Sequence, residues 1–360
     1  MPAPLLNPWP RSARNAATAR GVVTRNHDTG IVAIGRNEGE RLRRCLESAI
    51  PQVSQVVYVD SGSTDGSREL ARSLGVAVVE LDNETPFTAA RARNAGFDVL
   101  AEGLVFVQFV DGDCELDPRW IARAREEMLA NPNTAVACGR RAERHPSDSI
   151  YNRLCDMEWD TPIGEATECG GDSLIRTDRF RAVGGFCPDL IAGEEPELCS
   201  RLRAAGGRVV RVDAPMTLHD ARMDSFSQWW TRSVRAGHAN AEGAVCQAAE
   251  GGPRAGREVR STWFWGAALP GLVALAGLAF GGAAALLLAA LYPLQIARIA
   301  RRHPRPRFSD AEQWLYAAAC VLGKLPNAQG QLRYWLARLT GRRSELIEYK
   351  GPIAPGGEPS

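Results

Sequence analysis

The feature that most restricts how this chain can fold is an uncharged stretch toward its C-terminus. From Trp263 to Ala297 the chain reads WFWGAALPGLVALAGLAFGGAAALLLAALYPLQIA and contains no charged side chain. One membrane-spanning helix needs only about 20 apolar residues. The stretch therefore predicts a membrane-embedded segment, and Gly281 and Gly282 near its middle divide it into two halves of roughly 18 residues each.

Arginines lie on both sides of this stretch and indicate its topology. They are Arg254, Arg257 and Arg260 before it, and Arg298, Arg301, Arg302, Arg305 and Arg307 after it. Basic flanks favour the cytoplasmic side of a membrane. A transmembrane hairpin over residues 263–300 puts both flanks on that side, so we expect a hairpin, with a single tilted helix as the alternative.

The segments around the hairpin are assigned from composition. Residues 301–350 place apolar side chains on helical faces with basic residues between them, which predicts amphipathic helices lying on an anionic membrane surface. The alternative is that these helices dock onto the rest of the protein. We expect a disordered lead over residues 1–28, which has no apolar run typical of a signal peptide. We also expect a linker over 246–262 and a disordered tail over 351–360.

Overall charge and cysteine use exclude several classes of function. The 360 residues carry a net charge of +1, which gives no support to nucleic-acid binding. The nine cysteines are scattered, odd in number and without a CxxC pair. That pattern is typical of reduced cytosolic thiols and favours neither a disulfide scaffold nor a zinc site.

Between residue 30 and about residue 215, short apolar runs alternate with segments of helical periodicity. GIVAIG, QVVYVD, VAVVEL and LVFVQFVD are the apolar runs, and each of the first three is followed by a helical pattern such as STDGSRELARSLG. This order predicts an α/β fold with a mostly parallel sheet flanked by helices. We expect this domain to occupy residues 29–245.

Polar clusters follow three of these predicted strands. Residues 36–38, the segment Asp60-Ser61-Gly62-Ser63 and the triplet Asp111-Gly112-Asp113 each come at the end of an apolar run. Ligands of parallel sheets bind beyond the carboxyl ends of the strands, so the clusters should face one crevice. Two aspartates separated by one glycine can both turn toward a hard divalent cation, which prefers oxygen ligands.

Five segments together resemble family 2 glycosyltransferases of the GT-A fold. They are GRNEGERLRRCLES, VVYVDSGSTDGS, ARARNAG, VDGDCELDP and GEEPELCSRLRAAG, in the family's order and within roughly residues 30 to 240. The resemblance implies an enzyme that transfers a sugar from a nucleotide-diphosphate sugar to an acceptor hydroxyl with inversion of the anomeric centre. UDP- and GDP-linked donors both fit this expectation.

The resemblance also implies roles for individual residues. The nucleotide-binding residues would be Arg36, Glu38, Asp60, Arg93 and Asp111. Asp60 would accept a hydrogen bond from the base, and Asp111 would touch the ribose or the metal. Asp113 would be the principal ligand of a Mg²⁺ or Mn²⁺ ion that bridges to the diphosphate and stabilises the leaving group.

A catalytic base and a further metal ligand follow from the same resemblance. The family's base is the aspartate of a Glu-Asp pair; here the matching position is Glu195, with Glu194 beside it, and either carboxylate remains a candidate. His219 resembles a histidine that serves as a further metal ligand after the last strand. The alternative is that His219 is a structural histidine.

Two further segments hold candidates for the donor-sugar and acceptor pocket. Gly171 permits close approach of the backbone, and Asp172 follows it at a position that lines the pocket in related enzymes. Gln228, Trp229 and Arg232 would clamp the acceptor or the diphosphate. For these three the alternative is an aromatic-anchored helix at the membrane interface.

The sequence thus predicts a membrane-associated, inverting glycosyltransferase of cell-envelope or exopolysaccharide synthesis that adds single sugars. Its expected partners are a nucleotide-diphosphate sugar, a lipid-linked or membrane-proximal acceptor and the lipid bilayer, with no nucleic acid. The expected location is the inner (cytoplasmic) membrane, with the catalytic domain on the cytoplasmic side. A non-catalytic membrane scaffold is the alternative from another class. A sugar nucleotidyltransferase is less favoured, because no glycine-rich triphosphate loop follows the first strand.

Overall fold

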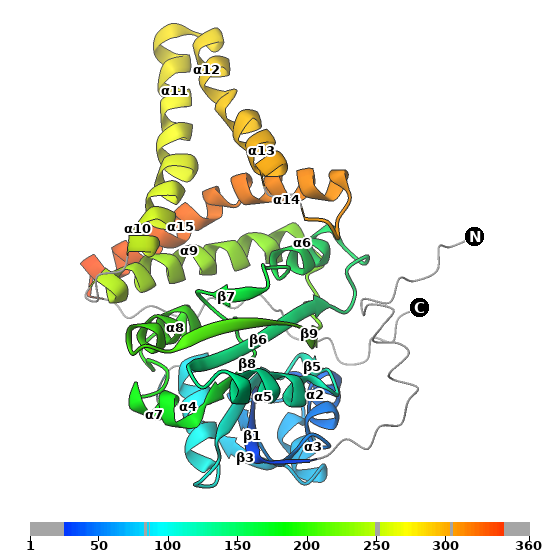
Figure 1. Cartoon of the computed structure of the whole chain (residues 1–360). Helices are drawn as coiled ribbons and strands as arrows, with labels where there is room; N and C mark the ends of the chain where they lie inside the picture. The colour runs from blue at the N-terminus through cyan, green and yellow to red at the C-terminus, as the bar shows by residue number, and fades with distance from the viewer. Residues whose placement is uncertain (1–24, 83–84, 86, 249–252, 303–304, 342–360) are drawn as a thin grey trace.

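The structure is a computed structural model, and it describes residues 25–82, 85, 87–248, 253–302 and 305–341. Residues 1–24 of the expected lead and the expected tail lie outside the described residues. Figure 1 shows an α/β body at the bottom and a pair of helices rising at the top. Between them lies a layer of long helices formed by α9 (Phe226–Ala248), α14 (Asp310–Leu322) and α15 (Lys324–Leu339).

The α/β body is built on one mixed sheet. Its strands are β1 (Asn26–Gly35), β2 (Val53–Asp60), β3 (Ala77–Glu80), β4 (Phe106–Asp111), β5 (Cys114–Leu116), β6 (Thr134–Glu143), β7 (Gly164–Ala166), β8 (Ser173–Arg176) and β9 (Arg208–His219). Within the described residues they follow the order β3-β2-β1-β4-β8-β6-β9-β5, and β7 pairs with β9.

The first four strands run parallel, as the alternating pattern predicts. β1 lies between β2 and β4, with Gly35 beside Asp60 and Ile34 beside Asp111. The polar clusters that follow these strands therefore come to one edge of the sheet. The second half is mixed, because β8 runs antiparallel to both β4 and β6. Strands β5, β7 and β8 are only three or four residues long, too short to show a period in the sequence.

Helices cover the sheet and fix the positions of site residues. They are α2 (Glu40–Ala49), α3 (Ser67–Ser73), α4 (Ala89–Val99), α5 (Trp120–Ala130), α6 (Ile150–Glu158), α7 (Thr177–Ala182) and α8 (Glu194–Ala204). Helix α4 begins where the Thr88 hydroxyl accepts the N–H of Arg91. A Cβ at Gly96 would lie 2.4 Å from a methyl of Val32, so glycine lets α4 lie directly on β1.

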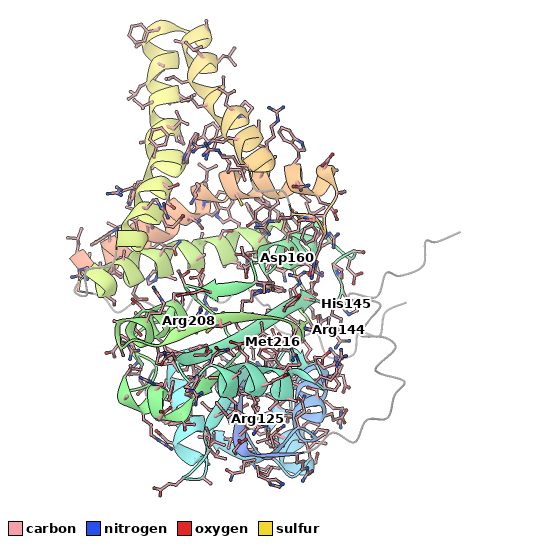
Figure 2. All side chains as sticks on the ribbon, viewed as in Figure 1. Arg125, Arg144, His145, Asp160, Arg208 and Met216 are labelled. Atoms are coloured by element: carbon pink, nitrogen blue, oxygen red, sulfur yellow. The ribbon has the colours of Figure 1, made fainter. Side chains whose placement is uncertain are left out.

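The uncharged stretch forms a hairpin of two helices. The first arm comprises α10 (Pro253–Trp263), a π-helical segment (Phe264–Ala268) and α11 (Leu269–Phe280), and the second comprises α12 (Gly282–Ala289) and α13 (Leu291–Arg302). Gly281 separates the arms with φ 86°. The helical stretches Gly256–Phe280 and Gly282–Arg302 are each long and apolar enough to cross a membrane. The two arms rise away from the α/β body (Figure 2), so the structure has the expected hairpin and not one tilted helix.

Helix α15 docks along α9. A Cβ at Gly330 would lie 1.9 Å from the carbonyl oxygen of Val234, so the two helix backbones meet directly. The Trp230 indole donates a hydrogen bond to Gln329 at 2.9 Å. Docking was the alternative for this segment. The opposite face of α15 still exposes Leu332, Leu336 and Leu339.

Candidate active site

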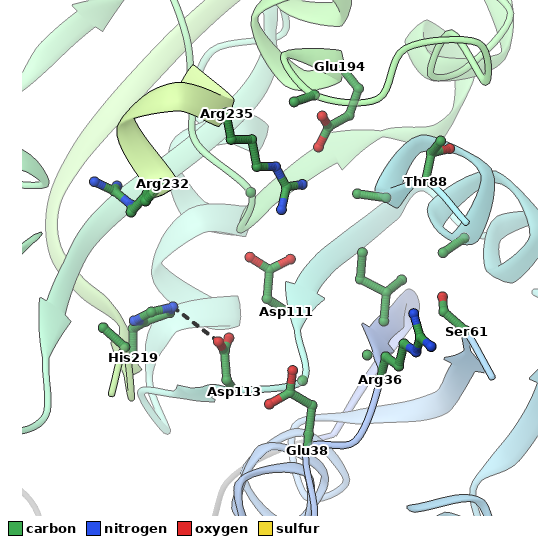
Figure 3. A pocket seen from close by; sticks show the side chains of 18 of the residues that line it. Arg36, Glu38, Ser61, Thr88, Asp111, Asp113, Glu194, His219, Arg232 and Arg235 are labelled. Atoms are coloured by element: carbon green, nitrogen blue, oxygen red, sulfur yellow. Dashed lines mark ion pairs between the residues drawn. The ribbon is translucent and has the colours of Figure 1, made fainter. Parts of the chain in front are cut away.

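A cavity of about 690 Å³ opens at the carboxyl edge of the parallel strands. Residues from all three polar clusters line it, including Arg36, Glu38, Ser61, Asp111 and Asp113. Figure 3 shows that Asp113 and His219 lie on one side of the cavity and Glu194 hangs from α8 on the other, with Asp111 between them. The expectation that the clusters share one crevice is met.

The acidic triplet is held by a tight contact with β1. The N–H of Gly112 donates to the carbonyl oxygen of Ile34 at 2.7 Å, and a Cβ at Gly112 would lie 3.0 Å from that oxygen. A residue without a side chain therefore lets the turn cross the end of β1. The turn directs Asp113 into the cavity, although its side chain is only 3% exposed.

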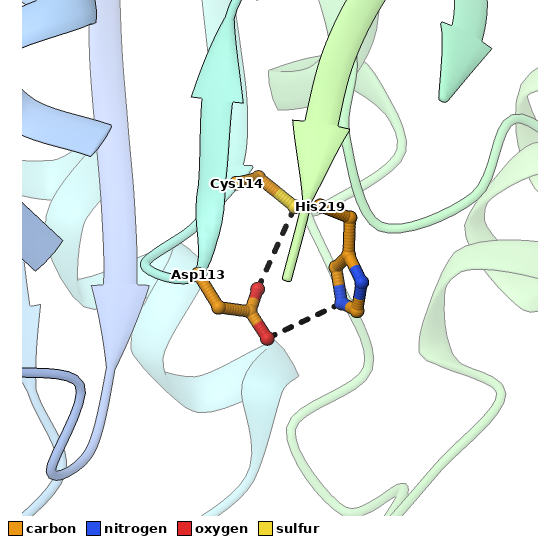
Figure 4. Close-up of side chains that lie close together, drawn as sticks. All are labelled: Asp113, Cys114 and His219. Carbon is orange, nitrogen blue, oxygen red and sulfur yellow. Dashed lines mark hydrogen bonds and ion pairs between the residues drawn. The ribbon is translucent and has the colours of Figure 1, made fainter. Parts of the chain in front are cut away.

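Strand pairing brings His219 to Asp113. Cys114 on β5 pairs with His219 at the end of β9, and the His219 Nε2 lies 3.2 Å from the Asp113 Oδ2 (Figure 4). Burial alone would lower the pKa of His219, but the Asp113 carboxylate outweighs burial and leaves that pKa above its ordinary value.

These residues fit a hard divalent cation. Asp113, Cys114 and His219 each offer a ligand atom, and the three atoms lie within 4.8 Å of one another. Burial raises the pKa of the Cys114 thiol, so Cys114 stays protonated and is a poor ligand for Mg²⁺ or Mn²⁺. The carboxylate and the imidazole are the two suitable donors from this group.

Asp111 is held between two arginines. Its Oδ1 lies 2.8 Å from Nη2 of Arg93, and its Oδ2 lies 2.9 Å from Nη2 of Arg141. Burial raises the pKa of Asp111, and the two guanidiniums reverse that effect and lower it below the ordinary value. Asp111 therefore remains a carboxylate, and both of its oxygens face positive charge.

Arg93 also reaches the opposite side of the cavity. Its side chain is 3% exposed, and its Nη1 lies 2.5 Å from Oε1 of Glu194. Burial opposes the charge of this guanidinium, and the carboxylates of Asp111 and Glu194 raise its pKa despite burial. One buried arginine thus links the acidic triplet to the candidate base.

The two candidate bases point in different directions. Glu194 lines the cavity, whereas Glu195 is not among the residues that line it. The Glu195 carboxylate accepts the backbone N–H of Cys169 and lies 3.3 Å from the thiol of Cys199. The family position favours Glu195, but the geometry favours Glu194, because in this conformation only Glu194 can meet a ligand in the cavity.

Asp172 lies behind the cavity wall and does not line it, contrary to the expected pocket role. Its carboxylate accepts hydrogen bonds from the N–H of Asp111 at 3.0 Å, from Arg141 at 2.9 Å and from the Thr217 hydroxyl at 2.7 Å. Asp172 therefore holds the acidic turn and the Arg141 side chain in position through these hydrogen bonds. Gly171 does line the cavity, and a Cβ there would lie 2.7 Å from Asp111 Oδ2.

The residues expected at the nucleotide differ in exposure. Arg36 and Glu38 line the cavity, and Glu38 forms a 2.8 Å ion pair with Arg41. Asp60 is buried and does not line it. Its carboxylate accepts hydrogen bonds from the N–H groups of residues 62 and 63 and from the Tyr58 hydroxyl, so it orders the loop that carries Ser61.

One of the three residues expected to clamp a ligand from α9 reaches the cavity. Arg232 lines the cavity and pairs with Glu158 at 2.7 Å. Gln228 accepts the N–H of Ser225 at the start of the helix, and Trp229 packs 5.6 Å from Phe226, ring centre to ring centre. Neither Gln228 nor Trp229 lines the cavity, because both lie in the first turn of the helix, where Gln228 caps its start and Trp229 packs against Phe226.

Several residues at the site were missed in the sequence. They are Arg141 and Glu143 on β6, Trp159 after α6 and Arg235 on α9. No short motif marks them. Arg235 follows Arg232 by three residues, and this helical spacing was the one available signal for a second basic group on that face.

Comparison with known proteins finds a family match over part of the chain. Residues 31–178 match the model of the family described as Glycosyl transferase family 2. These residues make up less than half of the chain, and through them it is similar to family 2 glycosyltransferases. The matched stretch contains the parallel strands and the acidic triplet, and it ends before Glu194 and His219.

Curated relatives are similar to this chain at low identity. The succinoglycan biosynthesis protein ExoA of Rhizobium meliloti (strain 1021) is 26% identical over 210 residues, which cover 54% of this chain and 63% of ExoA. The glycosyltransferase AglE of Haloferax volcanii is 24% identical over 214 residues, covering 56% of this chain and 69% of AglE. The match thus spans less than two thirds of ExoA.

A solved structure shares the fold. The mannosyltransferase PcManGT from Pyrobaculum calidifontis, in complex with GDP-Man and Mn²⁺, superposes with a TM-score of 0.55. It is 18% identical, and the alignment covers 85% of this chain and 92% of that chain. The expected GT-A fold is confirmed.

Proposed function

We propose that this chain is a metal-dependent, inverting glycosyltransferase that moves a sugar from a nucleotide-diphosphate sugar to a lipid-linked acceptor. The observation that carries the proposal is a single cavity with two chemically distinct sides. Asp113 and His219 form a cation-binding side, and Glu194 stands across the cavity as a base. The family match of residues 31–178 supports the class of reaction.

On the donor side, the chain's own residues suit an anionic diphosphate. A Mg²⁺ or Mn²⁺ ion bound by Asp113 and His219 would offset the negative charge that develops on the leaving diphosphate. Arg93 and Arg141 line the same cavity with guanidinium N–H groups that bind phosphate oxygens well. The GDP-Man and Mn²⁺ bound to PcManGT support this kind of donor and cation.

On the acceptor side, Glu194 accepts the proton of the attacking hydroxyl. A general base must lie within hydrogen-bond reach of the proton it removes, and Glu194 is the candidate carboxylate that faces the cavity from α8. Attack from the side opposite the leaving diphosphate inverts the anomeric centre. The ion pair with Arg93 orients the Glu194 carboxylate.

The hairpin supports an acceptor held in the bilayer. Helix α9 lines the cavity with Arg232 and Arg235, while α15 packs along the same helix and meets the base of the hairpin at Gly266. An enzyme anchored in this way works beside its membrane. The name of ExoA, a succinoglycan biosynthesis protein, supports an exopolysaccharide or cell-envelope product made at the inner (cytoplasmic) membrane.

Thermal unfolding of the detergent-solubilised full chain tests the donor site. Midpoints are measured with UDP or GDP, each with and without Mn²⁺, in the wild type, in Asp113→Ala and in the surface control Asp98→Ala. A ligand that binds the native state at 100 times its Kd stabilises it by about 2.7 kcal/mol. We expect one nucleotide to raise the midpoint only with Mn²⁺, and Asp113→Ala to abolish the rise.

The control should behave like the wild type, because Asp98 is exposed on α4. Absence of any shift with either nucleotide in the folded wild type would reject the transferase and restore the membrane scaffold as the better explanation. An undiminished rise of the midpoint in Asp113→Ala would show that Asp113 does not bind the cation.

A further inference from the structure

Glu143 is a fully buried carboxylate next to the candidate metal site. It is the last residue of β6, it is 0% exposed, and it pairs in register with His219 on the neighbouring parallel strand β9. A charged group buried in this way is costly unless hydrogen bonds and opposite charges surround it. The partners of Glu143 therefore indicate what it does.

Two backbone N–H groups fix the Glu143 carboxylate. The N–H of His145 donates to Oε1 at 3.2 Å, and the N–H of Ala221 donates to Oε2 at 3.2 Å. One of these groups follows β6 and the other follows β9, so the carboxylate ties together the ends of the two strands. Figure 2 labels His145 at this end of β6.

The same carboxylate faces the back of the His219 ring. Glu143 Oε2 lies 3.4 Å from Nδ1, while the opposite ring nitrogen, Nε2, lies 3.2 Å from Asp113 Oδ2. Trp159 packs against the ring at 4.6 Å between centroids and 72° between planes. The imidazole is therefore held in position by a carboxylate behind it and an indole beside it.

An imidazole that donates its Nδ1–H to a carboxylate presents the lone pair of Nε2 on the other side. We propose that Glu143 is the positioning residue of the cation site. It accepts the Nδ1–H of His219 and so directs Nε2, beside Asp113, toward a divalent cation. This inference rests on the proposed function, because it assumes that Asp113 and His219 bind Mg²⁺ or Mn²⁺.

Mn²⁺ binding to the full chain tests the role of Glu143 without measuring catalysis. The loss of the free Mn²⁺ signal in electron paramagnetic resonance is followed in the presence of the stabilising nucleotide. We expect Glu143→Gln to weaken Mn²⁺ affinity by about 10- to 100-fold, the range for a residue that orients a metal ligand. Glu143→Asp should restore part of the affinity. The control is Glu115→Gln, a 36% exposed carboxylate on neighbouring β5 that pairs with Arg144.

A double variant separates positioning from a general loss of negative charge. If Glu143 acts through His219, Glu143→Gln should weaken Mn²⁺ binding little further in a His219→Ala background. An equal loss in both backgrounds would overturn the proposal. So would wild-type affinity in a folded Glu143→Gln protein. Failure of the wild type itself to bind Mn²⁺ would instead reject the proposed function.

A wild-type measurement covers the case in which Glu143→Gln does not fold. With Co²⁺ in place of Mn²⁺, a histidine bound through Nε2 keeps its Nδ1 proton, which gives a strongly shifted proton resonance that disappears in D₂O. Because Glu143 is fully buried, the exchange of the Nδ1 proton for deuterium should be slow, and the resonance should fade gradually. Bound Co²⁺ without such a resonance would contradict the proposal, and His219→Ala should remove the signal.

Discussion

Two adjacent glutamates at the start of α8 lie in different surroundings. Glu194 faces the cavity and pairs with Arg93, whereas Glu195 turns inward to the N–H of Cys169. Successive residues of a helix point about 100° apart, so only one of two neighbours can face a given cavity. Gly193, with φ 82°, precedes the first turn that carries both glutamates.

Neutral substitutions distinguish the two candidate bases. Glu194→Gln should lower kcat for transfer by about 10²- to 10⁴-fold, the contribution of a general base, while the nucleotide still raises the unfolding midpoint. Glu195→Gln should retain most activity, because the amide oxygen of glutamine can still accept the Cys169 N–H. The release of UDP or GDP from the corresponding nucleotide sugar measures the turnover of both variants. Loss of turnover in Glu195→Gln alone would reassign the base.

At the scale of elements, glycines determine how α15 lies on α9. A Cβ at Gly330 would lie 1.9 Å from the Val234 carbonyl oxygen, and a Cβ at Gly237 would lie 2.1 Å from that of Asn327. Contact between backbones leaves no room for side chains. The crossing therefore holds only while both positions remain glycine.

Adding one methyl group tests this crossing. Gly330→Ala should destabilise the protein by about 1 to 3 kcal/mol, because the helices must separate to accommodate the Cβ. The control is Gly243→Ala on α9, where a new Cβ meets nothing within 4 Å. It should be neutral or stabilising by up to about 1 kcal/mol, since alanine favours helix over glycine. The measurement is the thermal unfolding midpoint of each variant. Equal midpoints would mean that the two helices can separate to accommodate the new Cβ without loss of stability.

At the scale of the whole molecule, one helix connects the apolar hairpin to the cavity. Helix α9 presents Arg232 and Arg235 to the cavity and packs against α15 on another face. The backbone of α15 at Lys324 in turn meets Gly266 at the base of the hairpin, where a Cβ would lie 2.0 Å from the Lys324 carbonyl oxygen. The hairpin and the cavity are thus parts of one packed unit.

Arginines in the hairpin test whether it inserts into a bilayer. Leu278 and Leu286 are 86% and 73% exposed, so Leu278→Arg with Leu286→Arg should leave the fold intact in detergent. Near the centre of a bilayer each arginine costs about 2.5 to 3.5 kcal/mol. We therefore expect the double variant to float poorly with anionic vesicles.

The matched control is Val99→Arg on α4. This residue is 52% exposed on the α/β body, so the variant should float with vesicles like the wild type. Equal flotation of the hairpin variant and the wild type would show that the hairpin stays outside the hydrocarbon core.

Local sequence patterns determined the parallel half of the sheet, the hairpin and the place of the acidic triplet. The period of apolar residues reports burial, and a glycine between two aspartates marks a turn, without knowledge of distant residues. The resemblance to family 2 glycosyltransferases brought Asp113 and His219 into one hypothesis, and the pairing of β5 with β9 brings the two side chains together.

Only the tertiary structure decided which polar groups face the cavity. Asp172 and Asp60 satisfy the backbone behind the wall, while Arg141 and Glu143 reach the site although no motif marks them. The places of Arg141 and Glu143 depend on the register of β6 against β9, which pairs residues about 76 apart in sequence. Side chains alternate between the two faces of a strand, so a shift of β6 by one residue would turn Arg141 and Glu143 to the other face of the sheet. That register is fixed by packing across the whole sheet, and no single segment contains it.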